Sequence, residues 1–128
     1  IGSVNMFEGL VVEDMEGHAI IDCPELERNI YIGHGVTTSM SDKTISYALR
    51  PEKLLVTTTE PEGEFNWSTG TVHDIAYLGG HSVFHIKLPS GMIVQAFMAN
   101  AERLGARPTW DDQVFVYWED DSGVVLRS

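Results

Sequence analysis

The sequence predicts an all-β fold. Short segments in which apolar and polar residues alternate recur along its 128 residues, and no stretch of about a dozen residues keeps the 3.6-residue period of an amphipathic helix. Glycine, proline, aspartate and serine, which favour turns, separate these segments. With 43% hydrophobic residues, the chain is long enough to form one domain of ordinary size, or two very small ones that share a core.

The first half of the chain contains four predicted strands. They are Leu10–Val12, Ala19–Ile21, Ser46–Leu49 and Leu54–Thr58. The first two form a predicted hairpin, because Gly17 between them can adopt the positive φ that a tight turn requires. Pro51 fixes φ and cannot donate a ladder hydrogen bond, so we expect the chain to turn there through a single helical turn from Pro51 to Leu54.

The second half follows a linker-like run, Glu60–Glu64. Its predicted strands are Thr71–Leu78, Ser82–Leu88, Met92–Met98, Gln113–Trp118 and Val124–Leu126. Period-two alternation in the second of these predicts that Phe84, Ile86 and Leu88 face the core. A short helix over Ala99–Leu104, ended by Gly105, is the one helix that we expect.

An internal repeat indicates how the strands are grouped. The segment Asn5–Val11 aligns with Asn66–Val72, and the two share Asn, Gly and Val at the same offsets. With four or five strands in each half, the repeat predicts two OB-like barrels, which manage their exposed edges by partial closure. The approximate halves are residues 1–62 and 63–128.

The composition disfavours several functions. The formal net charge of −11 makes a phosphate backbone a repelled partner, so nucleic acid is not an expected ligand. No segment approaches the roughly 20 apolar residues of a membrane span, so we expect no direct membrane insertion. The single cysteine, Cys23, has no Cys or His neighbour at metal-ligand spacing and fits a reducing, cytoplasmic setting.

The sequence offers no catalytic or metal site. No glycine precedes a lysine, so a P-loop is excluded within these residues. His81 and His85 are four residues apart in a predicted strand, about 13 Å at about 3.3 Å per residue, and cannot share one metal ion unless the strand bends. Ser82 and Ser90 lie near histidines in sequence only, without an elbow motif.

Several short motifs carry a family resemblance. They are Tyr47–Leu54 (YALRPEKL), Gly70–Val72, Ile75–Gly79 (IAYLG), Ile1–Asn5 and Pro108–Trp118. In these motifs the chain resembles the C-terminal regulatory region of ABC-importer ATP-binding subunits, which is built from the OB-like TOBE module. It is most similar to that region in the polyamine (putrescine or spermidine) importers.

The resemblance implies a regulatory and dimerisation domain whose nucleotide-binding domain is absent from residues 1–128. These residues would then not be an enzyme and would need no cofactor, since ATP and Mg²⁺ would bind the missing ATPase domain. The expected partners are a second copy of the ATPase subunit and the membrane subunits of the transporter. The expected location is cytoplasmic, peripheral to the inner membrane. The resemblance also implies that both halves are built from discontinuous pieces, with the first and last strands exchanged between them.

Candidate site residues fall into two groups. Arg50, Pro51 and Glu52 can form an ion pair at a proline turn, and the resemblance implies that they act as a hinge between the barrels. Candidate contacts with a partner or ligand lie in the predicted loops and strand ends: Tyr77, Gly79, Asn100, Trp110, Asp111, Asp112 and Glu119.

Two interpretations of the aromatic residues stay open. Trp67, Trp110, Trp118, Tyr77 and Tyr117 can be core or interface anchors. Alternatively, Trp110 with Asp111, Asp112 and Glu119 can form a cage for an organic cation such as a polyamine effector. An oxyanion, which related TOBE modules bind, is a further alternative that the acidic charge disfavours.

Overall fold

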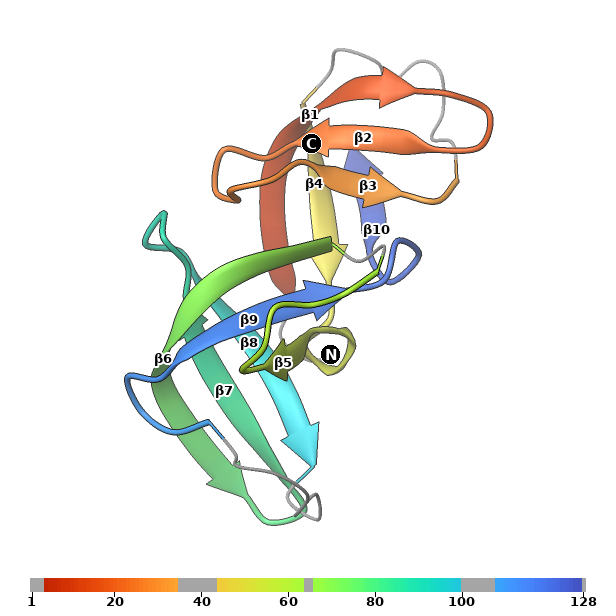
Figure 1. Cartoon of the computed structure of the whole chain (residues 1–128). Helices are drawn as coiled ribbons and strands as arrows, with labels where there is room; N and C mark the ends of the chain where they lie inside the picture. Colours follow the sequence, from red (N-terminus) through yellow and green to blue (C-terminus); the bar gives the residue numbers. More distant parts are fainter. Residues whose placement is uncertain (1–3, 35–43, 64–65, 100–107, 128) are drawn as a thin grey trace.

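Two five-stranded antiparallel sheets form the molecule (Figure 1). The computed structural model describes residues 4–34, 44–63, 66–99 and 108–127. The first sheet has the order β10 (Val124–Arg127), β4 (Thr44–Leu49), β1 (Asn5–Asp14), β2 (Ala19–Asp22) and β3 (Ile30–Ile32). The second has the order β5 (Leu55–Thr57), β9 (Gln113–Trp118), β6 (Asn66–Leu78), β7 (His81–Lys87) and β8 (Ile93–Ala99). The predicted all-β fold is therefore confirmed.

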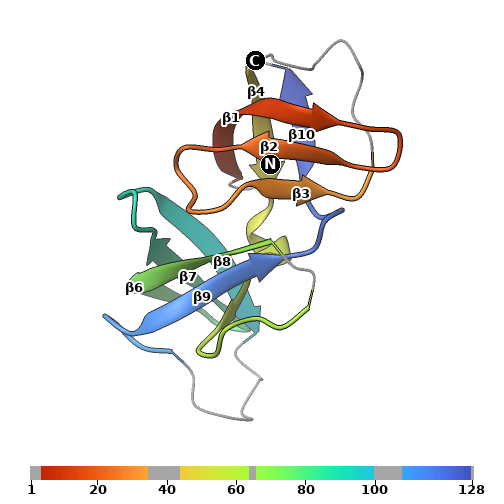
Figure 2. The ribbon, with the colours of Figure 1, turned by 45° about the horizontal axis from the view of Figure 1, so that its top comes forward.

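The two sheets repeat one topology, with β1–β4 corresponding to β6–β9. Each sheet is completed by a strand from elsewhere in the chain, since β10 pairs with β4 and β5 pairs with β9. Figures 1 and 2 show β10 in the half of the molecule that holds β1–β4, and β5 in the other half. The expected exchange is confirmed for the last strand. It is wrong for the first, because β1 stays in its own sheet and β5 crosses instead.

The internal repeat corresponds to equivalent positions in β1 and β6. Both strands contain a register shift at the residue after the shared valine, between Val11 and Glu13 in β1 and between Val72 and Asp74 in β6. The shared glycine permits close approach of the neighbouring strand. A Cβ atom on Gly9 would lie 2.6 Å from the Asp22 carbonyl oxygen, and one on Gly70 would lie 2.5 Å from Ile86 Cγ2. The repeat therefore marks how each sheet bends into a barrel.

Alternation along the strands places the core between the curved sheets. Phe84, Ile86 and Leu88 are buried as predicted. Trp118, the last residue of β9, stacks on Phe7 of β1 with ring centroids 6.2 Å apart and ring planes at 10°. Phe7 also contacts Tyr47 of β4, and burial raises the pKa of Tyr47 to about 12. A side chain of the second sheet thus packs in the core of the first barrel.

Other sequence expectations are confirmed or corrected at particular segments. The helical turn at Pro51 is present as η2 (Pro51–Lys53). Strand β3 was not predicted, because its three residues, Ile30–Ile32, are too few to show a period. The expected helix over Ala99–Leu104 begins on the last residue of β8, and the rest of it lies outside the described residues.

Two buried asparagine side chains join the barrels through the outer strands β3 and β8. The Nδ2 group of Asn5 donates to the Gln95 carbonyl oxygen (2.8 Å), and the Gln95 N–H donates to Asn5 Oδ1 (2.7 Å). The Nδ2 group of Asn66 donates to the Tyr31 carbonyl oxygen (2.9 Å), and the Tyr31 N–H donates to Asn66 Oδ1 (2.8 Å). Each amide thus pairs with a strand edge as a neighbouring peptide group would.

We expect Asn66→Ala to lower the free energy of unfolding by about 1–3 kcal/mol, since it leaves the Tyr31 N–H and carbonyl without their protein partners. Asn66→Asp keeps an acceptor for the N–H but turns a buried carboxylate oxygen toward the Tyr31 carbonyl oxygen, so it should also destabilise the protein. Asn29→Ala, at an exposed loop asparagine, is the control and should change stability by less than about 0.5 kcal/mol. Urea denaturation measures all three, and equal stability of Asn66→Ala and the control would refute the role of the amide.

Candidate interaction surfaces

An exposed aromatic and acidic surface lies where the end of β6 meets the loop before β9. We call it the Trp110 patch and define it as Asp74, Tyr77, Trp110 and Asp111. The rings of Tyr77 and Trp110 meet edge to face with centroids 6.2 Å apart. Their exposed fractions are 60% and 47%. Two segments that the sequence separates by more than thirty residues therefore share one surface.

The loop that carries Trp110 is held against β6 by a set of short contacts. The Asp111 N–H donates to the Val72 carbonyl (2.8 Å), and the Val72 N–H donates to the Asp112 carbonyl (2.9 Å). Asp112 Oδ2 accepts a hydrogen bond from the Thr109 N–H (2.8 Å). Asp111 adopts a φ of 68°, a conformation that aspartate tolerates better than most residues. These contacts fix the backbone on both sides of Trp110.

The Trp110 ring is oriented by Asp74. Its Nε1–H donates to Asp74 Oδ1 (3.2 Å), which also accepts a hydrogen bond from the Ile75 N–H (2.9 Å). The hydrogen bond from Trp110, followed by that from Ile75, lowers the pKa of Asp74 below its ordinary value. The carboxylate is therefore charged at neutral pH. About half of the Trp110 side chain remains exposed to solvent.

The structure brings together only part of the predicted contact set. Gly79, with a φ of 74°, lies in the hairpin turn next to the Trp110 patch. Asn100 lies outside the described residues. Glu119 follows β9, whereas Trp110 and Asp112 precede it, so about 20 Å of strand separates them at about 3.3 Å per residue. One small cation therefore cannot contact Glu119 and Trp110 together.

The predicted hinge residues form the connection between the two sheets. Arg50 follows β4, Pro51 is buried at the start of η2, and β5 of the other sheet begins directly after Leu54. Arg50 and Glu52 form an ion pair with 4.0 Å between Arg50 Nη1 and Glu52 Oε2. Because both side chains are exposed, this ion pair contributes little to stability. The position is that of a link between barrels, and a hinge function of these residues stays a prediction.

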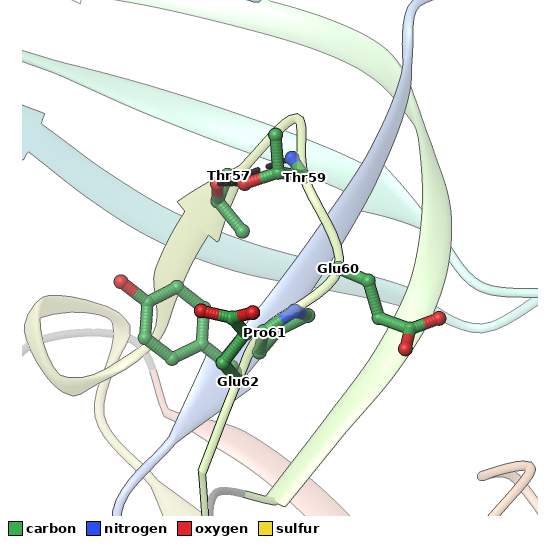
Figure 3. A pocket seen from close by; sticks show the side chains of 6 residues that line it. Thr57, Thr59, Glu60, Pro61 and Glu62 are labelled. Atoms are coloured by element: carbon green, nitrogen blue, oxygen red, sulfur yellow. Dashed lines mark hydrogen bonds between the residues drawn. The ribbon is translucent and has the colours of Figure 1, made fainter.

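Sequence reasoning missed a hollow of about 460 Å³ beside the β5–β6 connection. Figure 3 shows this hollow, which is lined by Thr57, Thr59, Glu60, Pro61, Glu62 and Tyr117. The two glutamates point to opposite sides of Pro61 in this view. The run Glu60–Glu64 has the composition of a linker, and its residues Glu60, Pro61 and Glu62 line the hollow because they lie beside Tyr117 of β9.

The described residues contain no group of three His, Cys, Asp or Glu side chains that could hold a metal ion. Cys23 is buried, and desolvation followed by the charges of Glu25 and Asp22 raises the pKa of its thiol to about 12. The thiol is therefore protonated and unreactive at neutral pH. Among the same described residues, no helix has the length and apolar character needed to cross a membrane.

Comparison with known proteins gives the family. The model of the TOBE domain matches residues 47–126, which is more than half of the chain. The chain is 39% identical over 127 residues to the putrescine transport ATP-binding protein PotG of Escherichia coli (strain K12), covering 98% of this chain and 33% of PotG. It is 29% identical to the spermidine/putrescine import ATP-binding protein PotA of Treponema pallidum (strain Nichols), covering 99% of this chain and 36% of PotA.

The chain therefore spans about a third of the length of these curated relatives. A solved structure of the cytoplasmic molybdate-binding protein ModG, with molybdate bound, superposes with a TM-score of 0.79 at 18% sequence identity and covers 97% of this chain and 96% of that one. This likeness confirms the predicted fold of paired OB-like barrels. Because the family model matches more than half of the chain, including every strand of the second sheet, the resemblance drawn from the short sequence motifs is confirmed, and the chain belongs to the TOBE domain family.

Proposed function

We propose that this chain is the regulatory and dimerisation module of the ATP-binding subunit of an ABC importer for polyamines. The observation that carries the proposal is the 39% identity to PotG over 98% of the chain. ATP and Mg²⁺ then bind the part of the subunit that lies outside residues 1–128, since no glycine precedes a lysine here as a P-loop requires. The subunit works at the cytoplasmic face of the membrane, against the membrane subunits of the importer.

The module acts as a tether between two ATPase chains. A β domain that contacts its twin keeps the chains at high effective concentration when their nucleotide domains separate. The exchange of strands between the sheets supports this role. Because β5 belongs to the second sheet and β10 to the first, the two barrels form one unit that can transmit force. Arg50, Pro51 and Glu52, at the connection between the sheets, are the proposed hinge.

We expect PotG that lacks the region matched by this chain to lose dimerisation in the nucleotide-free state and to lose regulated ATP hydrolysis. A chimaera that carries this chain in place of that region should regain both. Light scattering and steady-state hydrolysis measure the two properties. The control is this chain added unfused, which should not restore either, because a tether works through covalent linkage. Retention of both properties by the truncated PotG would overturn the proposal.

A second candidate function is the binding of a small organic cation in the hollow beside Tyr117. Its lining combines the carboxylates of Glu60 and Glu62 with an aromatic ring, and the net charge of the chain is −11. A polyamine effector fits this chemistry. The oxyanion alternative finds no basic side chain among the lining residues, although the ModG structure contains molybdate.

Calorimetric titration with putrescine, spermidine, molybdate and sulfate separates these alternatives. We expect saturable heat with the polyamines alone, and an affinity lowered about fivefold by Glu60→Gln with Glu62→Gln, at about 0.5 kcal/mol for each exposed charge. The matched control is Glu16→Gln with Asp121→Asn, which removes two exposed acids elsewhere. Absence of polyamine binding, or equal loss in the control, would refute the cation site.

A further inference from the structure

The Trp110 patch has the properties of a protein-binding hot spot. Its anchors are a tryptophan and a tyrosine, the side chains that dominate such sites, and both are more than 45% exposed. The backbone around Trp110 is fixed by the contacts of Val72 with Asp111 and Asp112, and the ring is fixed by Asp74. Little conformational entropy would therefore be lost when a partner covers it.

The shape of the patch favours a polypeptide over a small molecule. Small ligands bind in concave sites that bury most of their surface. Tyr77 and Trp110 instead project from the end of β6 and from a loop, with about half of their surface in solvent. The hollow described above is lined by other residues, on the connection after β5. The aromatic rings of the patch thus offer an anchor surface that an extended partner can cover.

The negative charge of the Trp110 patch favours a basic partner. The Asp74 carboxylate accepts a hydrogen bond from the Trp110 indole, and the exposed Asp111 follows Trp110 in the chain. A guanidinium or ammonium group can contact an indole face and a carboxylate at the same time. The net charge of −11 would accelerate association with a basic partner.

We propose that the Trp110 patch is a docking surface for a basic polypeptide segment in which an aliphatic or aromatic anchor is flanked by lysine or arginine. The anchor packs on Trp110 and Tyr77, and the basic side chains pair with Asp74 and Asp111. This inference deepens the proposed interaction role and rests on it, since it states the chemistry of one partner that the module would contact.

The test is selection of random dodecapeptides displayed on phage against the isolated chain. We expect the selected peptides to carry an apolar residue flanked by Lys or Arg, and their affinity to fall several-fold between about 50 and about 300 mM NaCl. Trp110→Ala should weaken synthetic versions of them at least about tenfold. Asp111→Asn should weaken them about threefold and keeps the fold, because asparagine tolerates the φ of 68°.

Two matched controls isolate the patch. Tyr31→Ala removes an equally exposed aromatic residue from β3, and Asp121→Asn removes an exposed acid from the turn before β10. Neither should change peptide affinity by more than about twofold. Thermal unfolding of Trp110→Ala checks its fold, and Asp111→Asn supplies a second variant that tests the charge pairing by itself.

Each remaining outcome overturns the proposal. These outcomes are failure to enrich any peptide, enrichment of peptides without basic residues, and binding that Trp110→Ala leaves intact. Saturable binding of free spermidine that Trp110→Ala abolishes would assign the patch to a small cation instead. Because the selection uses the isolated chain, its result is independent of the PotG chimaera. Refutation of the docking surface is therefore distinguishable from refutation of the proposed dimerisation role.

Discussion

The architecture depends on two buried asparagine amides that each join one barrel to the outer strand of the other. Asn5 of β1 pairs with Gln95 of β8, and Asn66 of β6 pairs with Tyr31 of β3. Strand edges in small barrels otherwise present unpaired N–H and carbonyl groups, which attract other chains. The Asn5 side chain satisfies the N–H and carbonyl of Gln95, and the Asn66 side chain satisfies those of Tyr31. Each asparagine thereby holds the two barrels in contact.

Exchange of β5 and β10 makes the two barrels one folding unit. Neither sheet is complete without a strand from the other half of the sequence, and Trp118 of β9 packs on Phe7 of β1. An arrangement with this degree of interlocking resists separation of the barrels. The Trp110 patch lies before β9 and Glu119 lies after it, so β9 sets the separation between these two exposed features.

Prediction from the sequence was accurate where short-range patterns dominate. Period-two alternation located most strands and the buried face of β7, and Pro51 located the helical turn of η2. It failed at β3, whose three residues carry no periodic signal, and at the cage of Trp110 with Glu119, which lie at opposite ends of β9. The hollow beside Tyr117 was missed because its acidic run has the composition of a linker.

The sequence by itself determined the all-β class, the repeat of Asn, Gly and Val, and the family, because these depend on local periodicity and on residues close along the chain. Only the tertiary structure decided that β5 and β10 change sheets, that the repeated asparagines bridge the barrels, and that Tyr77 meets Trp110. These features depend on contacts between residues far apart in sequence, and pairing across such distances follows from how the sheets close rather than from any local preference.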